Sequence, residues 1–315
     1  MTDEIRDGMN RRGLLAHCAG WAGAGALYTM TGGIASSISL DAALAATPRH
    51  GGSKPFTFLQ ISDTHIGFDK PANPNARGTA IEAVEKIKAL PFKPDLIIHT
   101  GDITHLSTAA QFDDAAQILS GLGAPVFYVP GEHDFLDEGQ GKEFLSRYGK
   151  GTLGTGWHSF DHNGVHFVAL NNVANLKPGG MAHLGDDQLA WLRKDLAAQS
   201  ASTPIVVFGH IPLWTVYEQW GWGTDDSAQA LAFLKRFGSV TVLNGHIHQI
   251  IQKVEGNVSF HSARSTAYPQ PAPGAAPSPG PLKVPAEQLP AMLGIRTARF
   301  VRGSEPIALI DQSFA

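Results

Sequence analysis

Apolar runs of strand length alternate with amphipathic stretches in the part of the chain that follows the N-terminal segment. The apolar run at residues 56–61 and the strands expected at residues 94–100 and 125–129 each lead directly into polar or small residues. Between them, residues 80–90 and 109–122 place apolar side chains at the spacing of a helix that buries one face. This alternation predicts parallel strands joined by crossover helices.

A hairpin and a further helix are predicted in the middle of the chain. Apolar runs at residues 157–160 and 165–171 flank Asn163-Gly164, a pair that is typical of two-residue hairpin turns. Beyond the hairpin, Asp186 is expected to cap a helix whose leucines form one stripe as far as Leu196. The hairpin adds an antiparallel pair, so the fold is not expected to be purely parallel.

More strands follow in the C-terminal half. Residues 205–208 and 240–243 predict two strands, separated by an aromatic loop and a short helix at about 227–237. Residues 250–254 and 257–261 predict a second hairpin. We therefore expect the sheet to continue well beyond the middle of the chain.

The C-terminal segment is rich in proline. Eight prolines fall between residues 269 and 290, which favours an ordered loop or an extended wrap over a core element. Residues 307–310 predict a last edge strand. We therefore expect residues 269–315 to form a Pro-rich C-terminal extension.

The composition is that of a soluble globular protein, with 43% hydrophobic and 17% charged residues and a formal net charge of −4. This balance argues against a nucleic-acid-binding surface, because such a surface needs a basic patch to neutralise phosphates. Cys18 is the single cysteine, which excludes an intrachain disulfide and a thiolate metal cluster. The 14 histidines are unusual, since imidazole is the commonest metal ligand and titrates near neutral pH.

The N-terminal segment carries features of an export signal. Arg11-Arg12 precede a weakly hydrophobic stretch rich in Gly and Ala, and Ala43-Leu44-Ala45 has the small-x-small form of a cleavage site. Residues 1–46 look like a twin-arginine signal peptide, which implies a periplasmic or secreted protein. An amphipathic helix and a membrane anchor are the alternatives, but the glycines and the weak hydrophobicity disfavour a stable membrane span.

Residue types that bind metal ions follow five of the predicted strands directly. Side chains at the carboxyl ends of strands in an open α/β sheet converge on a common cleft. In extended backbone, side chains two residues apart point to the same face, so we expect His246 and His248 to enter this cleft together. The five motifs are Asp63-Thr64-His65, Gly101-Asp102, Gly131-Glu132-His133-Asp134, Gly209-His210 and Gly245-His246-Ile247-His248.

The order of these motifs resembles that of the calcineurin-like metallophosphoesterase family, whose pattern is Asp-x-His, Gly-Asp, Gly-Asn-His-Asp/Glu, Gly-His and Gly-His-x-His. The match extends over residues 63–248, and residues 183–192 are similar to the helix that this family carries before its fourth motif. The resemblance implies an α/β fold, a four-layer sandwich of two mixed β-sheets flanked by helices. It places a metallophosphoesterase domain at residues 47–268, between the signal peptide and the C-terminal extension.

The resemblance also implies a role for each of nine residues. Seven of them are expected to bind two divalent metal ions and two to act in proton transfer. One ion is assigned to Asp63, His65 and His248, the other to Glu132, His210 and His246, with Asp102 bridging both. His133 is expected to protonate the leaving oxygen, and Asp134 to orient His133.

The hydrolysis of phosphate esters explains these residue types. An anionic phosphate repels an anionic nucleophile, and two divalent cations about 3.5–4 Å apart remove this obstacle by binding phosphate oxygens and activating a water molecule. Mixed oxygen and imidazole ligands suit Mn, Fe or Zn. The expected cofactors are therefore two divalent metal ions from this group.

Glu132 departs from the family pattern, which has Asn at this position. A carboxylate can bind a metal ion more strongly than an amide oxygen, but it cannot donate an N–H to a phosphate oxygen. It also adds a negative charge beside an anionic substrate. Glu132 therefore tunes the metal, shifts the substrate preference, or marks a site that has lost activity.

The resemblance implies a hydrolase of small-molecule phosphate esters that uses a metal-bridging hydroxide as nucleophile. A phosphodiesterase is favoured, because bacterial class III cyclic-nucleotide phosphodiesterases are similar in size and motif order. Export would separate the protein from cytoplasmic cyclic AMP and favours scavenging of other phosphodiesters. A phosphomonoesterase and a non-catalytic metal-binding protein of the same fold are the alternatives. The sequence leaves the natural substrate and the oligomeric state open.

Three further features have two interpretations each. His99 lies inside a predicted strand and is interpreted as a core histidine rather than a ligand. His105 either lines the cleft or remains outside it. The aromatic loop of residues 214–222 is interpreted as a packed lid, with a wall that stacks a flat group as the alternative.

Overall fold

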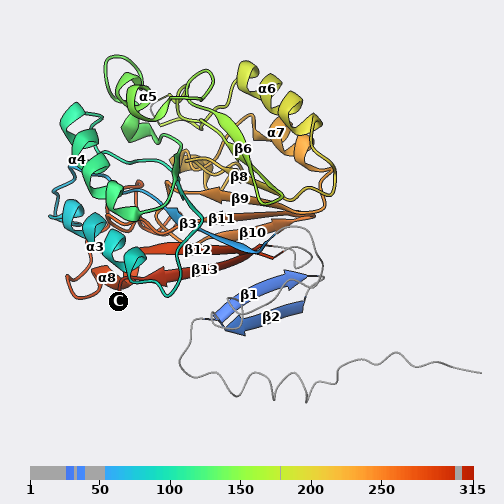
Figure 1. Ribbon diagram of the computed structural model, residues 1–315. Coiled ribbons are helices and arrows are strands. Elements are labelled where there is room, and N and C mark those ends of the chain that lie inside the picture. Colours follow the sequence, from blue (N-terminus) through green and yellow to red (C-terminus); the bar gives the residue numbers. More distant parts are fainter. Residues whose placement is uncertain (1–25, 32–33, 40–53, 178, 302–306) are drawn as a thin grey trace, which may run out of the picture.

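The computed structural model describes residues 26–31, 34–39, 54–177, 179–301 and 307–315. Two β-sheets lie face to face, and helices cover their outer faces (Figure 1). No helix in this described part of the chain is long and apolar enough to cross a membrane.

Two sheets carry the fold. The five-stranded sheet consists, in spatial order, of β13 (Ala308–Ser313), β12 (Gly294–Phe300), β3 (Phe56–Ile61), β4 (Leu96–His99) and β5 (Val126–Tyr128). The six-stranded sheet consists of β10 (Gln252–Glu255), β11 (Val258–Ser262), β9 (Val240–Asn244), β8 (Ile205–Phe208), β7 (Val165–Ala169) and β6 (His158–His162). Both sheets mix parallel and antiparallel pairs.

The helices fall into two groups. Those that pack on the five-stranded sheet are α3 (Ala76–Lys88), α4 (Ala109–Leu119), α5 (Lys142–Tyr148) and α8 (Leu289–Met292). Those that pack on the six-stranded sheet are α6 (Asp186–Ala197) and α7 (Ser227–Leu234). Short 3-10 turns complete the set: η1 (Ser120–Leu122), η2 (Glu132–Asp134) and η3 (Glu218–Trp220).

Apolar side chains from both sheets fill the space between them. Phe58 and Ile98 from the five-stranded sheet share a fully buried cluster with Phe167, Val206 and Leu243 from the six-stranded sheet. Two further clusters lie between each sheet and its helices. The expected four-layer sandwich of two mixed sheets flanked by helices is therefore confirmed.

The first strands and helices agree with the sequence pattern. β3, β4 and β5 are parallel neighbours, and the chain crosses between them through α3 and α4, as predicted. The first helix begins at Ala76 rather than residue 80, because the side chain of Asn75 caps it by accepting the N–H of Gly78 at 2.9 Å.

The helix cap predicted at Asp186 is wrong by one residue. Gly185 is the N-cap of α6, at a φ of 86°, and Asp186 is the first helical residue. The carboxylate of Asp226 accepts the N–H groups of Leu184 and Gly185, so a distant side chain satisfies the donors before the helix. Asp186 instead places a negative charge in the first turn, where it interacts favourably with the positive end of the helix dipole.

The sequence pattern missed β12. This strand pairs antiparallel with both β3 and β13, so it lies inside the five-stranded sheet, while β13 forms the edge that was predicted. Its apolar pattern is interrupted by Arg296, a fully buried residue whose guanidinium binds the carboxylate of Asp311 at 2.9 and 3.1 Å. Residues 294–313, assigned above to a C-terminal extension, thus supply two strands of the five-stranded sheet.

The signal-peptide prediction rests on Arg11-Arg12 and on Ala43-Leu44-Ala45, which lie outside the described residues. Within residues 1–46, the structure describes β1 (Ala26–Thr31) and β2 (Ile34–Ser39), which pair antiparallel in a sheet of their own. Export of the protein remains a prediction.

Candidate metal centre

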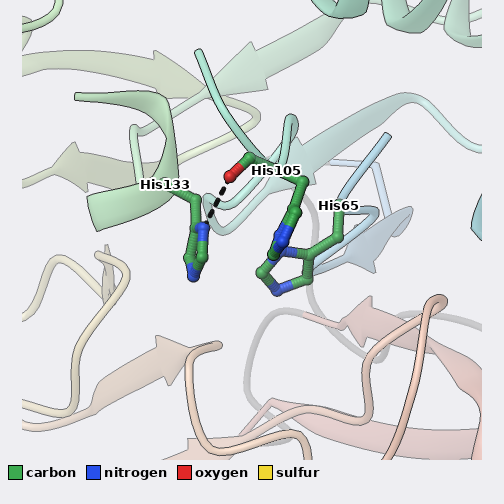
Figure 2. Close-up of side chains that lie close together, drawn as sticks. All are labelled: His65, His105 and His133. Atoms are coloured by element: carbon green, nitrogen blue, oxygen red, sulfur yellow. Dashed lines mark hydrogen bonds between the residues drawn. The ribbon is translucent and has the colours of Figure 1, made fainter. Parts of the chain in front are cut away.

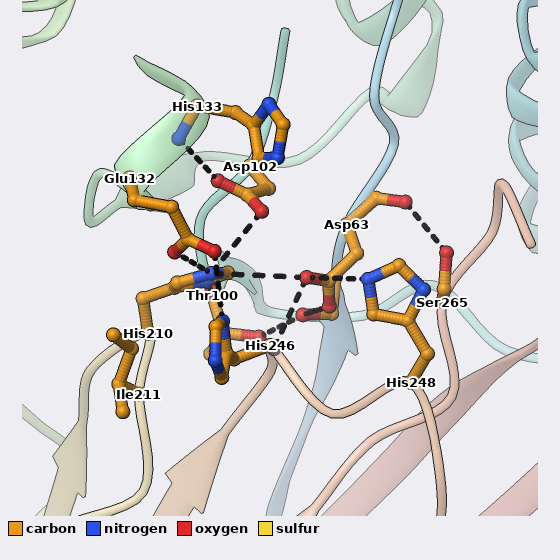
Figure 3. A network of polar contacts seen from close by, with 12 residues as sticks. Asp63, Thr100, Asp102, Glu132, His133, His210, Ile211, His246, His248 and Ser265 are labelled. Atoms are coloured by element: carbon orange, nitrogen blue, oxygen red, sulfur yellow. Dashed lines mark hydrogen bonds and ion pairs between the residues drawn. The ribbon is translucent and has the colours of Figure 1, made fainter. Parts of the chain in front are cut away.

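All nine predicted site residues lie in loops that follow the carboxyl ends of β3, β4, β5, β8 and β9. The first three strands belong to one sheet and the last two to the other. These loops meet at one end of the sandwich, so residues up to 185 positions apart in the chain, counted from Asp63 to His248, come together in one polar cluster (Figure 3).

One group of ligand atoms is formed by Asp63, His65 and His248. The Nε2 atoms of the two histidines lie 3.3 Å apart. Asp63 Oδ1 lies 3.2 Å from His248 Nε2, and all three side chains are buried. This is the grouping that the sequence motifs predict for one ion.

A second group is formed by Glu132, His210 and His246. The two Glu132 oxygens lie 2.9 Å from His210 Nε2 and 3.0 Å from His246 Nδ1. Asp102 stands between the groups, since its Oδ2 lies 3.4 Å from His65 Nε2 and 3.3 Å from His210 Nε2. Asp102 therefore has the position of a shared ligand.

The donor atoms fit two cations. Ligands at about 2.0–2.2 Å from one ion lie about 3.0–3.5 Å from each other, and the separations above are close to this range. Glu132 Oε2, His210 Nε2 and His246 Nδ1 are buried but have no well-aligned hydrogen-bond partner among the described residues, so their mutual contacts do not satisfy them. Oxygen and imidazole donors of this kind suit Mn, Fe or Zn.

Backbone carbonyls select the ligating nitrogen of two histidines. His210 Nδ1 donates to the carbonyl of Thr100 at 2.6 Å, and His248 Nδ1 donates to the carbonyl of Tyr268 at 2.6 Å. A carbonyl can only accept, so Nδ1 of each ring carries a proton, and Nε2 is the nitrogen that faces the ligand group. Such outer contacts fix both the tautomer and the orientation of a metal ligand.

The ligand loops have a left-handed backbone at five non-glycine positions. The φ angles are 53° for Asp63, 40° for His65, 51° for Asp102, 68° for His246 and 53° for His248. Such conformations cost about 1–3 kcal/mol each and persist where the surrounding fold imposes them, often at functional sites. The loops are thus held in shapes that aim these side chains.

The expectation that His246 and His248 act together from extended backbone is wrong. Strand β9 ends at Asn244, and both histidines have positive φ. Their rings separate: His246 lies against His210, with ring centroids 5.2 Å apart, and His248 lies against His65, also at 5.2 Å. One motif therefore serves both groups of ligands.

His133 lies beside both groups, and its ring centroid is 4.8 Å from that of His65. Its backbone N–H donates to Asp102 Oδ1 at 2.9 Å, and its ring Nδ1 donates to the carbonyl of His105 at 2.7 Å. The His105 ring stacks on it at 4.7 Å (Figure 2). Burial lowers the pKa of His133, but the charges of Asp102 and Glu132 outweigh this and raise it.

Asp134 was expected to orient His133, but its carboxylate makes no hydrogen bond to the His133 ring. Its carboxylate accepts the backbone N–H groups of Ile103 at 3.0 Å, Thr104 at 2.8 Å and Gly131 at 3.0 Å, and the Thr104 hydroxyl at 3.0 Å. Asp134 therefore ties the loop that carries Asp102 to the loop that carries Glu132 and His133. The carbonyl of His105 orients the His133 ring instead.

The ionised form of Asp134 suits these contacts. Burial and the charge of Asp102 raise the pKa of Asp134 to about 7. The three backbone N–H partners act in the opposite direction, because they can only donate and favour a carboxylate. A proton on Asp134 would have only the Thr104 hydroxyl as an acceptor within this network.

Glu132 is charged in this environment. Burial raises the pKa of Glu132, but the neighbouring His246 and His210 outweigh it and hold this pKa well below its usual value. Asp63 behaves in the same way: burial opposes its ionisation, and His248 and His210 lower its pKa. The site thus presents anionic oxygens to a cation.

Two residues near the site were missed by the sequence patterns. The hydroxyl of Tyr268 lies 3.1 Å from His65 Nε2, and Ser265 Oγ donates to the carbonyl of Asp63 at 2.8 Å. Burial and the charge of Asp102 raise the pKa of Tyr268 above its usual value. Neither residue is part of a recognised motif, so nothing in the sequence marks them.

The two histidines whose position the sequence left open, His105 and His99, differ in their distance from the ligand groups. His105 lies beside His133 and His65, with its Nδ1 3.5 Å from His65 Nδ1. His99 is fully buried in β4, with its Nε2 3.2 Å from the Thr64 hydroxyl, as expected for a core histidine.

A cavity of about 490 Å³ adjoins the second ligand group at Glu132 and His246. Trp220, from the aromatic loop, lies in its wall, whereas Trp222 is fully buried. The described residues that line it include no lysine or arginine. Its apolar wall is formed mainly by Phe135, Leu136, Val173, Leu176, Ile211, Trp220 and Pro279.

Comparison with known proteins identifies the family. The calcineurin-like phosphoesterase family matches residues 56–250, which include every candidate ligand described above. The chain belongs to the calcineurin-like phosphoesterase family. Family membership makes it a metallophosphoesterase, and the fold of this family implies divalent metal ions at the site.

Similar proteins include both diester and monoester enzymes by name. A 3′,5′-cyclic-nucleotide phosphodiesterase of Nostoc sp. is 24% identical over 223 residues, which cover 68% of this chain and 79% of that protein. A serine/threonine-protein phosphatase of Danio rerio is 27% identical over 227 residues, covering 62% of this chain and 71% of that protein.

Solved structures support the fold alone. A dimetal phosphatase from Danio rerio has a TM-score of 0.58 at 13% identity and covers 82% of this chain and 96% of that chain. A purple acid phosphatase from yellow lupin has a TM-score of 0.58 at 12% identity and covers 84% of this chain and 52% of that chain.

Proposed function

We propose that this protein is a metal-dependent phosphodiesterase in which seven residues of the cluster bind the metal ions and His133 donates a proton, as expected from their motifs, while Asp134 holds the loops together. The observation that carries the proposal is the position of Asp102 Oδ2, which lies 3.3–3.4 Å from a histidine of each ligand group. When bound, two divalent ions at these groups supply positive charge to the phosphate oxygens and an activated water as nucleophile.

His133 is the proton donor in this proposal. When the P–O bond breaks, the electron pair stays on the leaving oxygen, which takes the proton from His133 Nε2. The His105 carbonyl keeps the other ring proton on Nδ1, and the bond from the His133 N–H to Asp102 fixes the residue beside both ligand groups. General acid catalysis of this kind contributes about 10²–10⁴ in rate.

The charge of the site and the apolar lining of the cavity favour a diester over a monoester. A diester carries one negative charge, whereas a monoester near neutral pH carries close to two, and Glu132 adds a further negative charge to the site. The described lining of the adjoining cavity has no lysine or arginine that would offset this repulsion. Its apolar wall suits the second substituent of a diester, and the similarity to a cyclic-nucleotide phosphodiesterase agrees with this.

We further propose that the protein acts outside the cytoplasm on scavenged phosphodiesters. This rests on the sequence of residues 1–46 alone. Replacing Arg11 and Arg12 by lysine is expected to leave the protein in the cytoplasmic fraction, whereas the parent protein is expected in the periplasm or medium. Equal distribution of both proteins would refute export by the twin-arginine route.

The catalytic proposal is tested with bis-p-nitrophenyl phosphate and p-nitrophenyl phosphate, with added Mn²⁺ and after chelation. We expect metal-dependent cleavage that favours the diester and a fall in kcat of about 10²–10⁴ in His133→Ala. Preference for the monoester would indicate a phosphomonoesterase. Bound metal without cleavage of either compound would indicate the non-catalytic alternative.

The substitution Glu132→Asn tests whether the unusual carboxylate is a working metal ligand or a change that impaired the site. If Glu132 is a working ligand, the variant is expected to bind metal more weakly and to hydrolyse the diester more slowly. A large gain in hydrolysis would instead show that Glu132 had impaired an ancestral site.

A further inference from the structure

Tyr268 is the one phenol that reaches the ligand atoms among the described residues. It lies after β11, beyond the stretch at residues 56–250 that matches the family, so no motif accounts for it. Its side chain is 3% exposed, and its hydroxyl lies 3.1 Å from His65 Nε2.

We propose that the hydroxyl oxygen of Tyr268 is an additional ligand of the cation held by Asp63, His65 and His248. The distance of 3.1 Å from His65 Nε2 is close to those between the other ligand atoms of this group, which are 3.2 Å and 3.3 Å. Two atoms at this separation can both lie about 2.0–2.2 Å from one ion.

A simple hydrogen bond from the phenol to His65 does not survive metal binding. The acceptor would be Nε2, which is also the atom that faces His248 and Asp102. When the lone pair of this nitrogen binds an ion, it is no longer available to Tyr268. The buried phenol then needs another partner, and the ion is the nearest candidate.

The surroundings hold Tyr268 in this position. Its ring packs against Phe68 at 4.3 Å, His248 at 4.6 Å and His65 at 4.8 Å. Its backbone carbonyl accepts the Nδ1 proton of His248, and its N–H donates to Ser265 Oγ. Tyr268 therefore positions one ligand by its backbone while offering its own side chain to the same ion.

A phenol ligand limits which metal ion this group is expected to bind. On binding, the O–H proton passes to solvent and the phenolate adds a negative charge to those of Asp63 and Asp102. Three anionic oxygens favour a more highly charged ion, so this group is expected to hold ferric iron more readily than zinc. This inference rests on the metal centre proposed above but not on the identity of the substrate.

The test uses the full chain, freed of metal and then loaded with ferric iron, and reads visible absorption without substrate. Iron bound by a phenolate has a charge-transfer band in the visible range, which imidazole and carboxylate ligands alone do not produce. We compare Tyr268→Phe with Tyr148→Phe, a matched control whose hydroxyl has no hydrogen-bond partner among the described residues and lies outside the ligand cluster. Iron content per chain and thermal unfolding are measured for each protein.

We expect the band in the parent protein and in Tyr148→Phe, and its loss in Tyr268→Phe while iron is retained. A band that persists in Tyr268→Phe would overturn the proposal. So would a parent protein that binds iron without the band, or that retains no ferric iron, and neither result depends on how the variant folds. Metal affinity alone would not decide the question, because losing an outer hydrogen bond also costs about 10–100-fold.

The outcome is distinguishable from a failure of the phosphodiesterase proposal. Because the band is read without substrate, it can be present in a protein that cleaves no diester. In that case the ligand assignment stands and only the proposed activity fails.

Discussion

Asp134→Asn is the substitution whose effect the structure determines most closely. Each carboxylate oxygen of Asp134 accepts two hydrogen bonds, and three of the four donors are backbone N–H groups. Asparagine has nearly the same shape but replaces one oxygen by an NH₂ group. In either orientation of the amide, at least one buried N–H then faces another donor.

The expected loss of stability follows from these contacts. A buried donor without an acceptor costs about 1–3 kcal/mol, and each remaining bond weakens by about 1 kcal/mol when its acceptor is no longer charged. Relief from burying a charge offsets part of this. We expect the free energy of unfolding to fall by about 2–5 kcal/mol.

Activity is expected to fall as well, although Asp134 touches no ligand group. The substitution loosens the loops that place Asp102 and His133, and a displacement of about 1 Å can reduce kcat by about 10². Metal affinity is expected to weaken with it, since Asp102 is the shared ligand position.

The assay is urea unfolding followed by circular dichroism with chelator present, so that metal binding does not contribute to the measured stability. Asp137→Asn is the control, because Asp137 also accepts two backbone N–H groups, from Gly141 and Glu143, but in a half-exposed loop where water can replace them. We expect it to lose less than about 1 kcal/mol. An equal loss in both variants would refute the argument that the buried charge of Asp134 holds the loops together.

Three further predictions concern other parts of the molecule. Burial lowers the pKa of His166, but hydrogen bonds to Asp195 and Asp161 outweigh this and raise it; the resulting stabilisation is complete below the unfolded pKa of about 6.5 and is lost as the pH rises through the higher folded pKa. Unfolding free energy measured against pH should show this fall, and a similar fall in Asp195→Asn would contradict it. Asp311→Ala leaves the buried Arg296 without its carboxylate and is expected to cost about 3–5 kcal/mol in urea unfolding, with a loss below about 1 kcal/mol as the contrary result. Trp220→Ala is expected to raise KM for the aromatic diester with little change in kcat, and an unchanged KM would exclude its wall of the cavity from substrate binding.

Much of the fold was predictable because burial and sequence pattern agree. β3 and β4 are buried at every position and most of their residues are apolar, so a largely apolar run marks each of them. β12 is equally buried for most of its length, yet it carries Arg296, and a pattern of apolar residues cannot indicate a charge that is paired with a residue elsewhere in the chain. The predicted cap of α6 was wrong for a related reason, because the carboxylate that accepts the N–H of the N-cap Gly185 belongs to Asp226, 40 residues beyond the start of the helix at Asp186.

The candidate site was predictable as a set of residues but not as a geometry. Motifs that follow strands meet at the same end of the sheets, and all nine residues do so. The partners that orient them are largely backbone carbonyls, at Thr100, His105 and Tyr268, and a carbonyl is present in every residue. The positive φ of His246 and His248 could not be predicted from the sequence either, although each histidine joins the ligand group that the resemblance implied.

The left-handed backbone of the ligand loops has a consequence for how this protein can change. At His65, His246 and His248, glycine would relieve a strained conformation while removing an imidazole, so mutations that abolish metal binding need not weaken the fold. Selection or engineering for thermal resistance alone would therefore drift toward inert variants, unless retention of the metal is selected at the same time. A library built on this chain should be screened for bound metal before it is ranked by melting temperature.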